Sequence, residues 1–417
     1  MITWVRYAFR NLLRNRRRSL YTILAVAIGF AAINVFGGFT DYIYTNLRES
    51  FIYVQGNGHL SVFKKGARVG NTVEDPLKHL LTREEILRVR ELAEADGNFI
   101  GISEVMNITG LISNGDITTI YIGMAWVPSE KYAFQEKARG LMSQLSFFEG
   151  KPLGDDLEIG IGIGHGLAEK LNSQFEADVI LMAPTVFGQI NAVDAQVLQF
   201  TDASMELLED KWVVMPLSLA RALYNTEGAS QINLLLMENA NLGVVRSAFE
   251  IKLHEAGIDV TVAPWRDLSP FYVKVEKMFR VIFLLMFLIV SIIIVMSVVN
   301  TVSMAVLERS REIGTLRAIG ARRYRVIMLF SFEGALLGLF GCLIGVVILV
   351  VALAFLGYAQ PYWTPPQMAR PIPLEVYLVS DYLLFSALFL TMLSFASGVF
   401  PARQIARQNI VEALGHV

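Results

Sequence analysis

Four long apolar stretches constrain the fold of this 417-residue chain more than any other feature. The hydrocarbon core of a bilayer is about 30 Å thick and a helix rises about 1.5 Å per residue, so about 20 apolar residues can cross it. Stretches of this length occur at residues 19–40, 281–307, 326–357 and 382–402. They predict a membrane protein with four transmembrane α-helices, arranged as one plus three.

The segment 41–272, between the first two stretches, has the pattern of a water-exposed domain. Its strand-like runs lie at 59–63, 117–125, 179–184, 212–216, 232–238 and 260–264. Thr82 and Glu85 form a capping box, which predicts the start of a helix. This mixture predicts a large α+β domain outside the membrane. The segment is long for a single core, so we expect two lobes, the second near 120–225. Residues 273–307 are then a continuous stalk and second span.

The placement of arginine predicts the orientation, because positively charged flanks of membrane helices stay in the cytoplasm. Segment 1–18 holds six Arg and no acid, 308–325 holds six Arg and two Glu, and the tail 403–417 adds two Arg. We expect these three segments in the cytoplasm. The domain 41–272 and the loop 358–381 are then expected on the opposite side.

The N-terminal segment, the charge of the large domain and the cysteine count give further expectations about the membrane anchor, the partners and disulfides. Segment 1–18 has the pattern of an amphipathic helix in the lipid headgroup region, leading into an uncleaved signal anchor. Residues 41–280 contain 32 Asp and Glu against 21 Lys and Arg, a net charge of −11. This acidic excess argues against nucleic acid as a partner. The single cysteine, Cys342, lies within the third stretch, so no intrachain disulfide is expected.

The arginine-rich segment 308–325 has helical periodicity. Its apolar residues Ile313, Leu316 and Ile319 recur every third position, which places them on one face of a helix lying at the membrane surface. Gly314 and Gly320 are expected at an end or at a close contact, because glycine weakens a helix interior. On composition alone, a basic loop that only sets the membrane orientation explains the segment equally well.

The third stretch carries a glycine stripe and one acid. At about 100° per residue, four glycines fall within an arc of about 60° and leave one flat helix face: Gly334, Gly338, Gly341 and Gly345. Such a face allows close packing, either within this chain or against another subunit. Glu333 is the only acid in the four predicted spans. We expect it to make an intramembrane polar contact with a nearby Arg or with backbone; a proton relay is the alternative.

The sequence shows no motif for catalysis or for binding a cofactor. There is no Walker A sequence, and the glycine-rich run 160–166 lacks the Lys and the Ser or Thr that bind phosphate and Mg²⁺. The histidines at 59, 79, 165, 254 and 416 lack metal-ligand spacing. We therefore expect no enzymatic activity, cofactor or metal in this chain.

The sequence REIGTLRAIGA at 311–321, the Glu333–Gly334 pair with its glycine-rich span, and PARQIARQNIVEAL at 401–414 resemble the FtsX-like permease domain. This superfamily of ABC transporter membrane subunits includes the lipoprotein-release (LolC/LolE) and macrolide-exporter (MacB) types. The one-plus-three arrangement of spans extends the resemblance to the whole chain.

The resemblance implies that 308–325 is a coupling helix gripped by a cytoplasmic ABC ATPase dimer. The implied coupling residues are Glu308, Arg311, Glu312, Gly314, Leu316, Arg317, Ala318, Gly320 and Ala321. ATP and Mg would be bound by that separate ATPase. The other implied partners are a second permease copy or paralogue, membrane lipid, a lipoprotein or amphiphilic substrate, and a periplasmic carrier. The implied location is the bacterial inner membrane, with both termini cytoplasmic and the large domain periplasmic.

Within the superfamily, the organisation is most similar to the lipoprotein-release permeases. The chain length, the expected separate ATPase and the strand sequence GNGHLSVF at 56–63 favour that group. The implied function is to transmit ATP-driven motion to the periplasmic domain for lipoprotein release or transport of another amphiphile. Two alternatives remain: an FtsX-like regulatory adaptor that activates a cell-wall hydrolase, and a MacB-like export pump subunit working with an adaptor and an outer-membrane tunnel.

Overall fold

The computed structural model describes residues 16–69, 72–73, 79–143, 148–155, 159–203, 206–363 and 371–407. The chain divides into two compact units. We call residues 1–43, 275–362 and 373–417 the helical unit, and residues 44–274 and 363–372 the α+β unit. The boundary between the units falls within two helices, α2 and α9, whose bounds are given below. The predicted segment 1–18 lies outside the described residues except for its last three positions.

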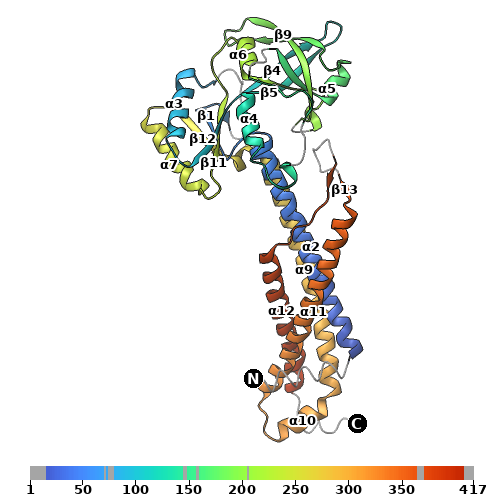
Figure 1. The fold of residues 1–417 in the computed structure, drawn as a ribbon. Helices are drawn as coiled ribbons and strands as arrows, with labels where there is room; N and C mark the ends of the chain where they lie inside the picture. Colours follow the sequence, from blue (N-terminus) through green and yellow to red (C-terminus); the bar gives the residue numbers. More distant parts are fainter. Residues whose placement is uncertain are drawn as a thin grey trace. The chain divides into compact units, whose positions relative to one another are not determined.

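Four helices among the described residues are long and apolar enough to cross a membrane (Figure 1). They are α2 (Arg16–Glu49), which continues as the π-helical turn η1 (Ser50–Val54), α9 (Pro270–Glu308), α11 (Arg323–Ala359) and α12 (Ser380–Ala406). The predicted fold class is therefore confirmed. Each helix extends beyond its apolar stretch, because hydrophobicity marks only the part in hydrocarbon while backbone hydrogen bonding continues past it.

The four helices pack around one apolar core in the helical unit. Buried residues from every helix contribute, among them Phe30, Val298, Phe330 and Leu390. Polar side chains also join helices: Thr22 and Thr301 share a hydrogen bond of 2.6 Å, and the Asn34 amide donates to the Ser386 hydroxyl at 3.0 Å. Buried polar groups that pair across helices satisfy each other where water is absent.

The α+β unit is built on one large sheet. Its strands are β1 (Leu60–Lys64), β4 (Phe99–Ser113), β5 (Thr118–Trp126), β6 (Phe148–Gly150), β7 (Gly160–Gly164), β8 (Asp178–Pro184), β9 (Ile190–Thr201), β10 (Trp212–Pro216), β11 (Gln231–Leu236) and β12 (Val260–Pro264). They are ordered β12-β1-β11-β4-β5-β10-β7-β9-β6, and β8 pairs with both β4 and β9. Two small ribbons are separate: β2 (Arg68–Val69) with β3 (Thr72–Val73), and β13 (Tyr362–Trp363) with β14 (Ile372–Pro373).

The double pairing of β8 closes part of this sheet into a barrel. The ring runs β4-β5-β10-β7-β9-β8 and back to β4. Its interior is filled by alternate side chains such as Tyr121, Leu181, Val197 and Met215. Helix α6 (Leu217–Tyr224) packs against strands β4, β8, β9 and β10, and α5 (His165–Lys170) packs against β7 and β9. Closure removes exposed strand edges, which otherwise promote aggregation.

The barrel corresponds to the lobe expected near 120–225, but its core begins earlier. Met106, Ile108 and Ile112 of β4 belong to it. The reason is the length of β4, because its first half pairs with β11 and its second half pairs with β5 and β8. A strand shared by two lobes has no turn or composition change at the lobe boundary for a sequence pattern to detect.

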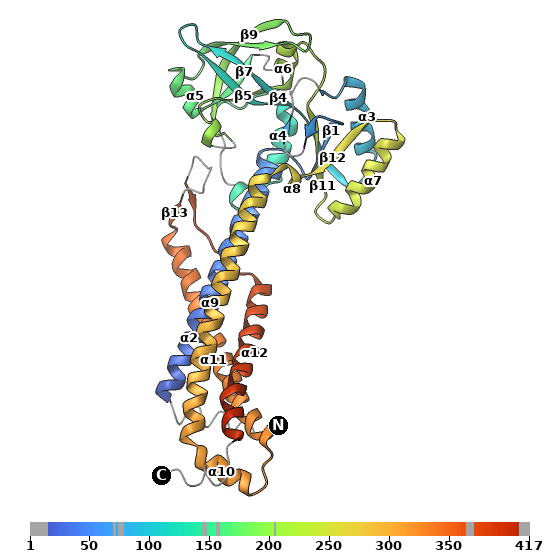
Figure 2. The same ribbon diagram turned by 180° about the vertical axis from the view of Figure 1, so that it is seen from behind.

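The other lobe consists of β12, β1, β11 and the start of β4, with α3 (Arg83–Glu94) and α7 (Leu242–Glu255) packed on it (Figure 2). The capping box at the start of α3 is confirmed, since the Glu85 amide donates to Thr82 Oγ1 at 3.3 Å and the Thr82 amide donates to the Glu85 carboxylate at 2.9 Å. The remaining elements of the α+β unit are α4 (Pro128–Gln135), η2 (Gly140–Ser143), η3 (Glu206–Leu208) and α8 (Trp265–Leu268).

Helix α4 carries a buried lysine. The Lys131 residue is 8% exposed, its Nζ lies 4.8 Å from the Trp126 ring centroid, and its stem occupies the space where Gly56 lacks a side chain. Glycine suits position 56 for two reasons. It leaves room for the lysine stem, and the φ of Gly56, +74°, lies in the left-handed region that favours glycine. Burial lowers the pKa of the Lys131 amine from 10.5 to about 7.

The lowered pKa of Lys131 predicts that the free energy of unfolding increases with pH in the alkaline range. Between about pH 7 and pH 10 the unfolded chain holds a proton on Lys131 that the folded chain releases. The free energy of unfolding therefore increases with pH, by up to about 1.4 kcal/mol per pH unit. Lys131→Met should lose that dependence. Thermal midpoints of both proteins, measured across this range, test the expectation, and two parallel pH profiles would contradict it.

Candidate functional site

The arginine-rich segment forms a helix between two sharp corners. Helix α10 (Ser310–Ala318) is separated from α9 only by Arg309, whose φ of −115° and ψ of 16° break the helix. At its other end, Gly320 has a φ of +103°, a conformation that residues with a Cβ rarely adopt. The helix is therefore shorter than the predicted segment 308–325, because these two positions turn the chain.

The two faces of α10 differ. Ile313 is 5% exposed and packs into the core of the helical unit, and Gly314 is buried beside it. Ile319 is 81% exposed, because the helix has already ended and the turn directs it outward. The predicted apolar face of Ile313, Leu316 and Ile319 is thus not a single buried face. The side chain of Leu316 lies outside the described part of the structure.

The outward side of α10 and the following turn is basic with apolar members. Its exposed residues are Arg311, Glu312, Thr315, Ala318, Ile319, Gly320, Arg322, Arg323, Tyr324 and Arg325. Arg317 and Ala321 are half-buried next to them. Glu308 forms an ion pair with Arg18 at 3.1 Å. We call the exposed set the α10 surface. Its shape and composition suit contact with another protein, because exposed apolar residues among arginines are typical of interfaces.

Glu333 lies in α11 next to a residue that the sequence motifs did not single out. Its carboxylate is 3.8 Å from Nη1 of Arg309, and the two side chains are only 6% and 8% exposed. The pairing joins the α9–α10 corner to α11. Arg309 is one of six arginines in its segment, and nothing in the sequence marks it as the one that turns inward.

The glycine stripe of α11 packs against two helices of the same chain. A Cβ on Gly334 would lie 2.5 Å from the Ser394 carbonyl oxygen, and one on Gly338 would lie 2.7 Å from the Ser394 hydroxyl, both on α12. Equivalent atoms on Gly341 and Gly345 would meet Val26 and Phe30 of α2 at 2.5 and 2.7 Å. Of the two predicted uses, the stripe therefore serves packing within this chain.

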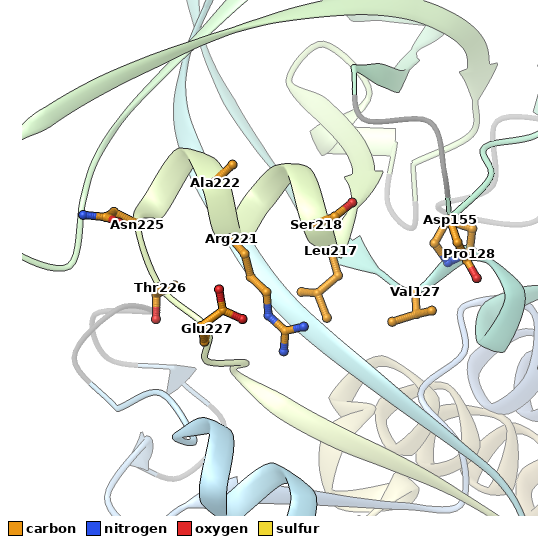
Figure 3. A pocket seen from close by; sticks show the side chains of 10 residues that line it. All are labelled: Val127, Pro128, Asp155, Leu217, Ser218, Arg221, Ala222, Asn225, Thr226 and Glu227. Carbon is orange, nitrogen blue, oxygen red and sulfur yellow. The ribbon is translucent and has the colours of Figure 1, made fainter.

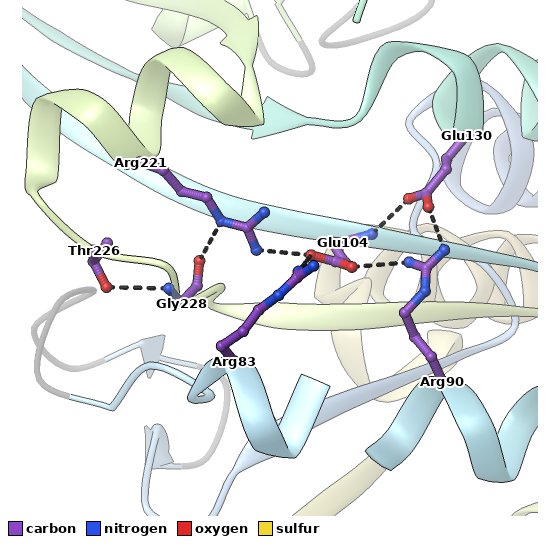
Figure 4. A network of polar contacts seen from close by, with 7 residues as sticks. All are labelled: Arg83, Arg90, Glu104, Glu130, Arg221, Thr226 and Gly228. Atoms are coloured by element: carbon purple, nitrogen blue, oxygen red, sulfur yellow. Dashed lines mark hydrogen bonds and ion pairs between the residues drawn. The ribbon is translucent and has the colours of Figure 1, made fainter. Parts of the chain in front are cut away.

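A buried charge cluster joins the two lobes of the α+β unit (Figure 4). The Glu104 carboxylate of β4 is 6% exposed and accepts hydrogen bonds from Arg90 of α3 at 2.9 Å and from Arg221 of α6 at 2.7 Å. Arg83 approaches it to 3.7 Å, and Arg90 also donates to Glu130 of α4 at 2.6 Å. Burial raises the pKa of Glu130 more than its bonds to Arg90 lower it.

Beside this cluster is a pocket of about 480 Å³. It is lined by Val127, Pro128, Asp155, Leu217, Ser218, Arg221, Ala222, Asn225, Thr226 and Glu227 (Figure 3). The Arg221 guanidinium in its wall already donates to Glu104 and to the Gly228 carbonyl. Asp155 likewise accepts from the Ser129 amide at 3.0 Å. Arg221 and Asp155 thus serve the fold, and the α10 surface is the better candidate for function.

Comparisons with known proteins agree with the sequence motifs. A family model described as the FtsX-like permease C-terminal domain matches residues 282–410. An uncharacterized ABC transporter permease of Methanocaldococcus jannaschii is 23% identical over 98% of this chain and 97% of its own length. The lipoprotein-releasing system transmembrane protein LolC of Neisseria meningitidis is 26% identical over 62% of this chain and 65% of its own length. The macrolide export ATP-binding/permease protein MacB of Marinobacter nauticus is 35% identical over 28% of this chain and 16% of its own length.

These matches confirm the resemblance inferred from the motifs. The matched residues 282–410 include the 311–321 motif, the glycine stripe and the beginning of the 401–414 motif. They also contain α10 and the last two hydrophobic helices whole, with most of α9. Residues 282–410 therefore carry an FtsX-like permease C-terminal domain, and the four hydrophobic helices make the chain a multi-pass membrane protein that is similar to ABC transporter permeases of the MacB and LolC types.

Proposed function

We propose that the α10 surface is the docking site for a separate cytoplasmic ABC ATPase dimer, which binds ATP and Mg²⁺. The observation that carries this proposal is the arrangement of α10 itself. One face is buried through Ile313, the other is exposed, and sharp corners connect it directly to α9 and α11. A short helix held in this way cannot move without displacing the helices at its two ends.

The motion is proposed to reach the α+β unit through α9. This helix is continuous from Pro270 to Glu308, with no proline or glycine after its first residue. A continuous helix keeps its hydrogen-bonded length, so a push at Glu308 shifts its other end rather than being absorbed. In this proposal the chain converts ATP-driven movement into work on the α+β unit and conducts no solute through a pore of its own.

The proposed orientation follows from charge. The α10 segment carries six Arg within 308–325, and positively charged loops stay in the cytoplasm. Segment 41–280, with a net charge of −11, then lies on the outer side, which is the periplasm for a bacterial inner-membrane protein. Both chain termini are placed in the cytoplasm by the same reasoning.

The proposed cargo is a lipoprotein or another amphiphile taken from the membrane and passed to a periplasmic carrier. The match to the lipoprotein-releasing protein LolC supports this, because it extends over 62% of the chain. A role in an export pump is the second candidate, favoured by the higher identity to MacB, 35%, over a shorter segment. Exposed apolar side chains along α9, such as Leu284, Leu288 and Ile292, suit contact with lipid or with a second permease subunit.

Ile319→Glu tests the docking site. Ile319 is 81% exposed, so the change should leave the fold intact while placing a charge at the centre of the proposed interface. We expect at least a tenfold loss of the ABC ATPase that co-purifies with the tagged permease, quantified by mass spectrometry. Gln404→Glu is the matched control, since it adds the same charge at an exposed position near the end of α12.

Equal recovery of the ATPase with Ile319→Glu and Gln404→Glu would refute the docking proposal. The same preparations, made from native membranes, serve to identify the cargo. Enrichment of lipid-modified proteins with the wild-type complex would support lipoprotein release, and enrichment of an adaptor with a tunnel protein would support the pump.

A further inference from the structure

The corner between α9 and α10 is attached to two different helices by two consecutive residues. Glu308 pairs with Arg18 of α2 at 3.1 Å, and both side chains are more than a third exposed. Arg309 turns the other way and pairs with Glu333 of α11 at 3.8 Å, where both side chains are almost fully buried. An exposed ion pair contributes little, whereas breaking a buried one leaves an uncompensated charge.

A gain in stability does not explain why Arg309 and Glu333 are buried together. Nη2 of Arg309 and Oε2 of Glu333 are buried and find no hydrogen-bond partner among the described residues. Removing two charges from water costs more than their attraction returns unless hydrogen bonds satisfy the remaining atoms. Apolar residues of similar size would stabilise this position better. The pair therefore needs a reason other than packing.

Glu333 is placed where α11 is held most closely to α12. Its neighbour Gly334 lies against the Ser394 carbonyl oxygen, and Gly398 of α12 lies against the Phe330 carbonyl oxygen, where an added Cβ would approach to 2.5 and 2.8 Å. Contacts this close between backbones leave no room for the helices to slide past each other. A force applied to Glu333 is thus applied to α11 and α12 together.

We propose that Arg309 and Glu333 are positioning residues that transmit the movement of α10 to the α11–α12 pair. The ATPase then displaces two groups of helices in one step: α9 through the chain itself, and α11 with α12 through this ion pair. This inference rests on the proposed function, because it assumes that an ATPase moves α10. The inference adds that the movement of α11 and α12 depends on the Arg309–Glu333 pair, which is buried and lies outside the surface proposed to bind the ATPase.

The experiment uses the full permease–ATPase complex in phosphatidylethanolamine–phosphatidylglycerol nanodiscs. Arg309→Gln and Glu333→Gln each remove one charge, and Glu333→Gln does so at nearly constant size. We expect each to lower the kcat of permease-dependent ATP hydrolysis at least tenfold, while the KM for ATP and the amount of bound ATPase stay within twofold of wild type. Arg309→Lys keeps the charge and should retain at least a third of the wild-type kcat.

Arg18→Gln is the matched control, because it removes the exposed ion pair of the same corner; its kcat should stay within twofold of wild type. A kcat within twofold for Arg309→Gln and Glu333→Gln would overturn the inference. So would loss of bound ATPase in these variants, because the pair would then act in assembly. Failure of the proposed function itself is recognised separately, by undiminished ATPase binding in Ile319→Glu.

Discussion

Replacing Gly123 by alanine should destabilise the barrel of the α+β unit by about 3 kcal/mol, at the upper end of what overpacking usually costs. Gly123 lies in β5 between Ile108 of β4 and Val213 of β10. A Cβ there would overlap the Val213 carbonyl oxygen. That oxygen belongs to backbone, so the clash is relieved only by separating the strands. Because β5 and β10 are part of a closed ring, the separation strains the other pairings as well.

Thermal unfolding of the purified chain in detergent, followed by tryptophan fluorescence, measures this effect. A loss of about 3 kcal/mol corresponds to a fall of about 10 °C for a domain of this size. Gly97→Ala is the matched control, since a Cβ at that position meets no atom within 4 Å. Equal midpoints for the two variants would show that β5 and β10 are not packed in this register.

Replacing Glu104 by glutamine should cost a similar amount, about 3 kcal/mol, for an electrostatic reason. The carboxylate is 6% exposed and accepts charge-assisted hydrogen bonds from Arg90 and Arg221, which are 25% and 16% exposed. Glutamine keeps the shape but removes the charge, so Arg221 loses its anion and Arg90 keeps only Glu130. Since Arg90 belongs to α3 and Arg221 to α6, the loss weakens the contact between the two lobes of the unit.

The matched control for this variant is Glu250→Gln, an identical change at an exposed position of α7. Surface charges of this kind usually change stability by less than about 0.5 kcal/mol. We expect the thermal midpoint to fall only in Glu104→Gln, and protease cleavage between the lobes to become faster. A midpoint equal to that of the control would mean that the cluster does not stabilise the contact between the lobes.

Local patterns predicted the features that depend on nearby residues. The apolar stretches located the four hydrophobic helices, and Thr82 with Glu85 located the start of α3, because each depends on residues within one element. The coupling segment 308–325 was located by its motif, but its helix covers only Ser310–Ala318. Arg309 and Gly320 end that helix, and only the latter has a residue type that signals a turn.

Features that join distant segments could not be read in this way. The closure of the barrel depends on β8 pairing with β4 across about 70 residues of sequence, and no local pattern records that register. The sharing of β4 between the two lobes has no local signal for the same reason. No local pattern distinguishes Arg309, because six arginines in one segment have the same side chain and only the fold decides which of them is buried.

Local sequence patterns were enough to predict four membrane helices, a large α+β insertion and a resemblance to the FtsX-like permeases, since hydrophobic length and short motifs are local properties. They also predicted that α11 has one flat glycine face. The packing of the helices divides this face between α12 and α2 and brings Arg309 to Glu333. Such contacts are set by how whole helices pack, which is decided by shape and polar pairing summed over many residues rather than by any one segment.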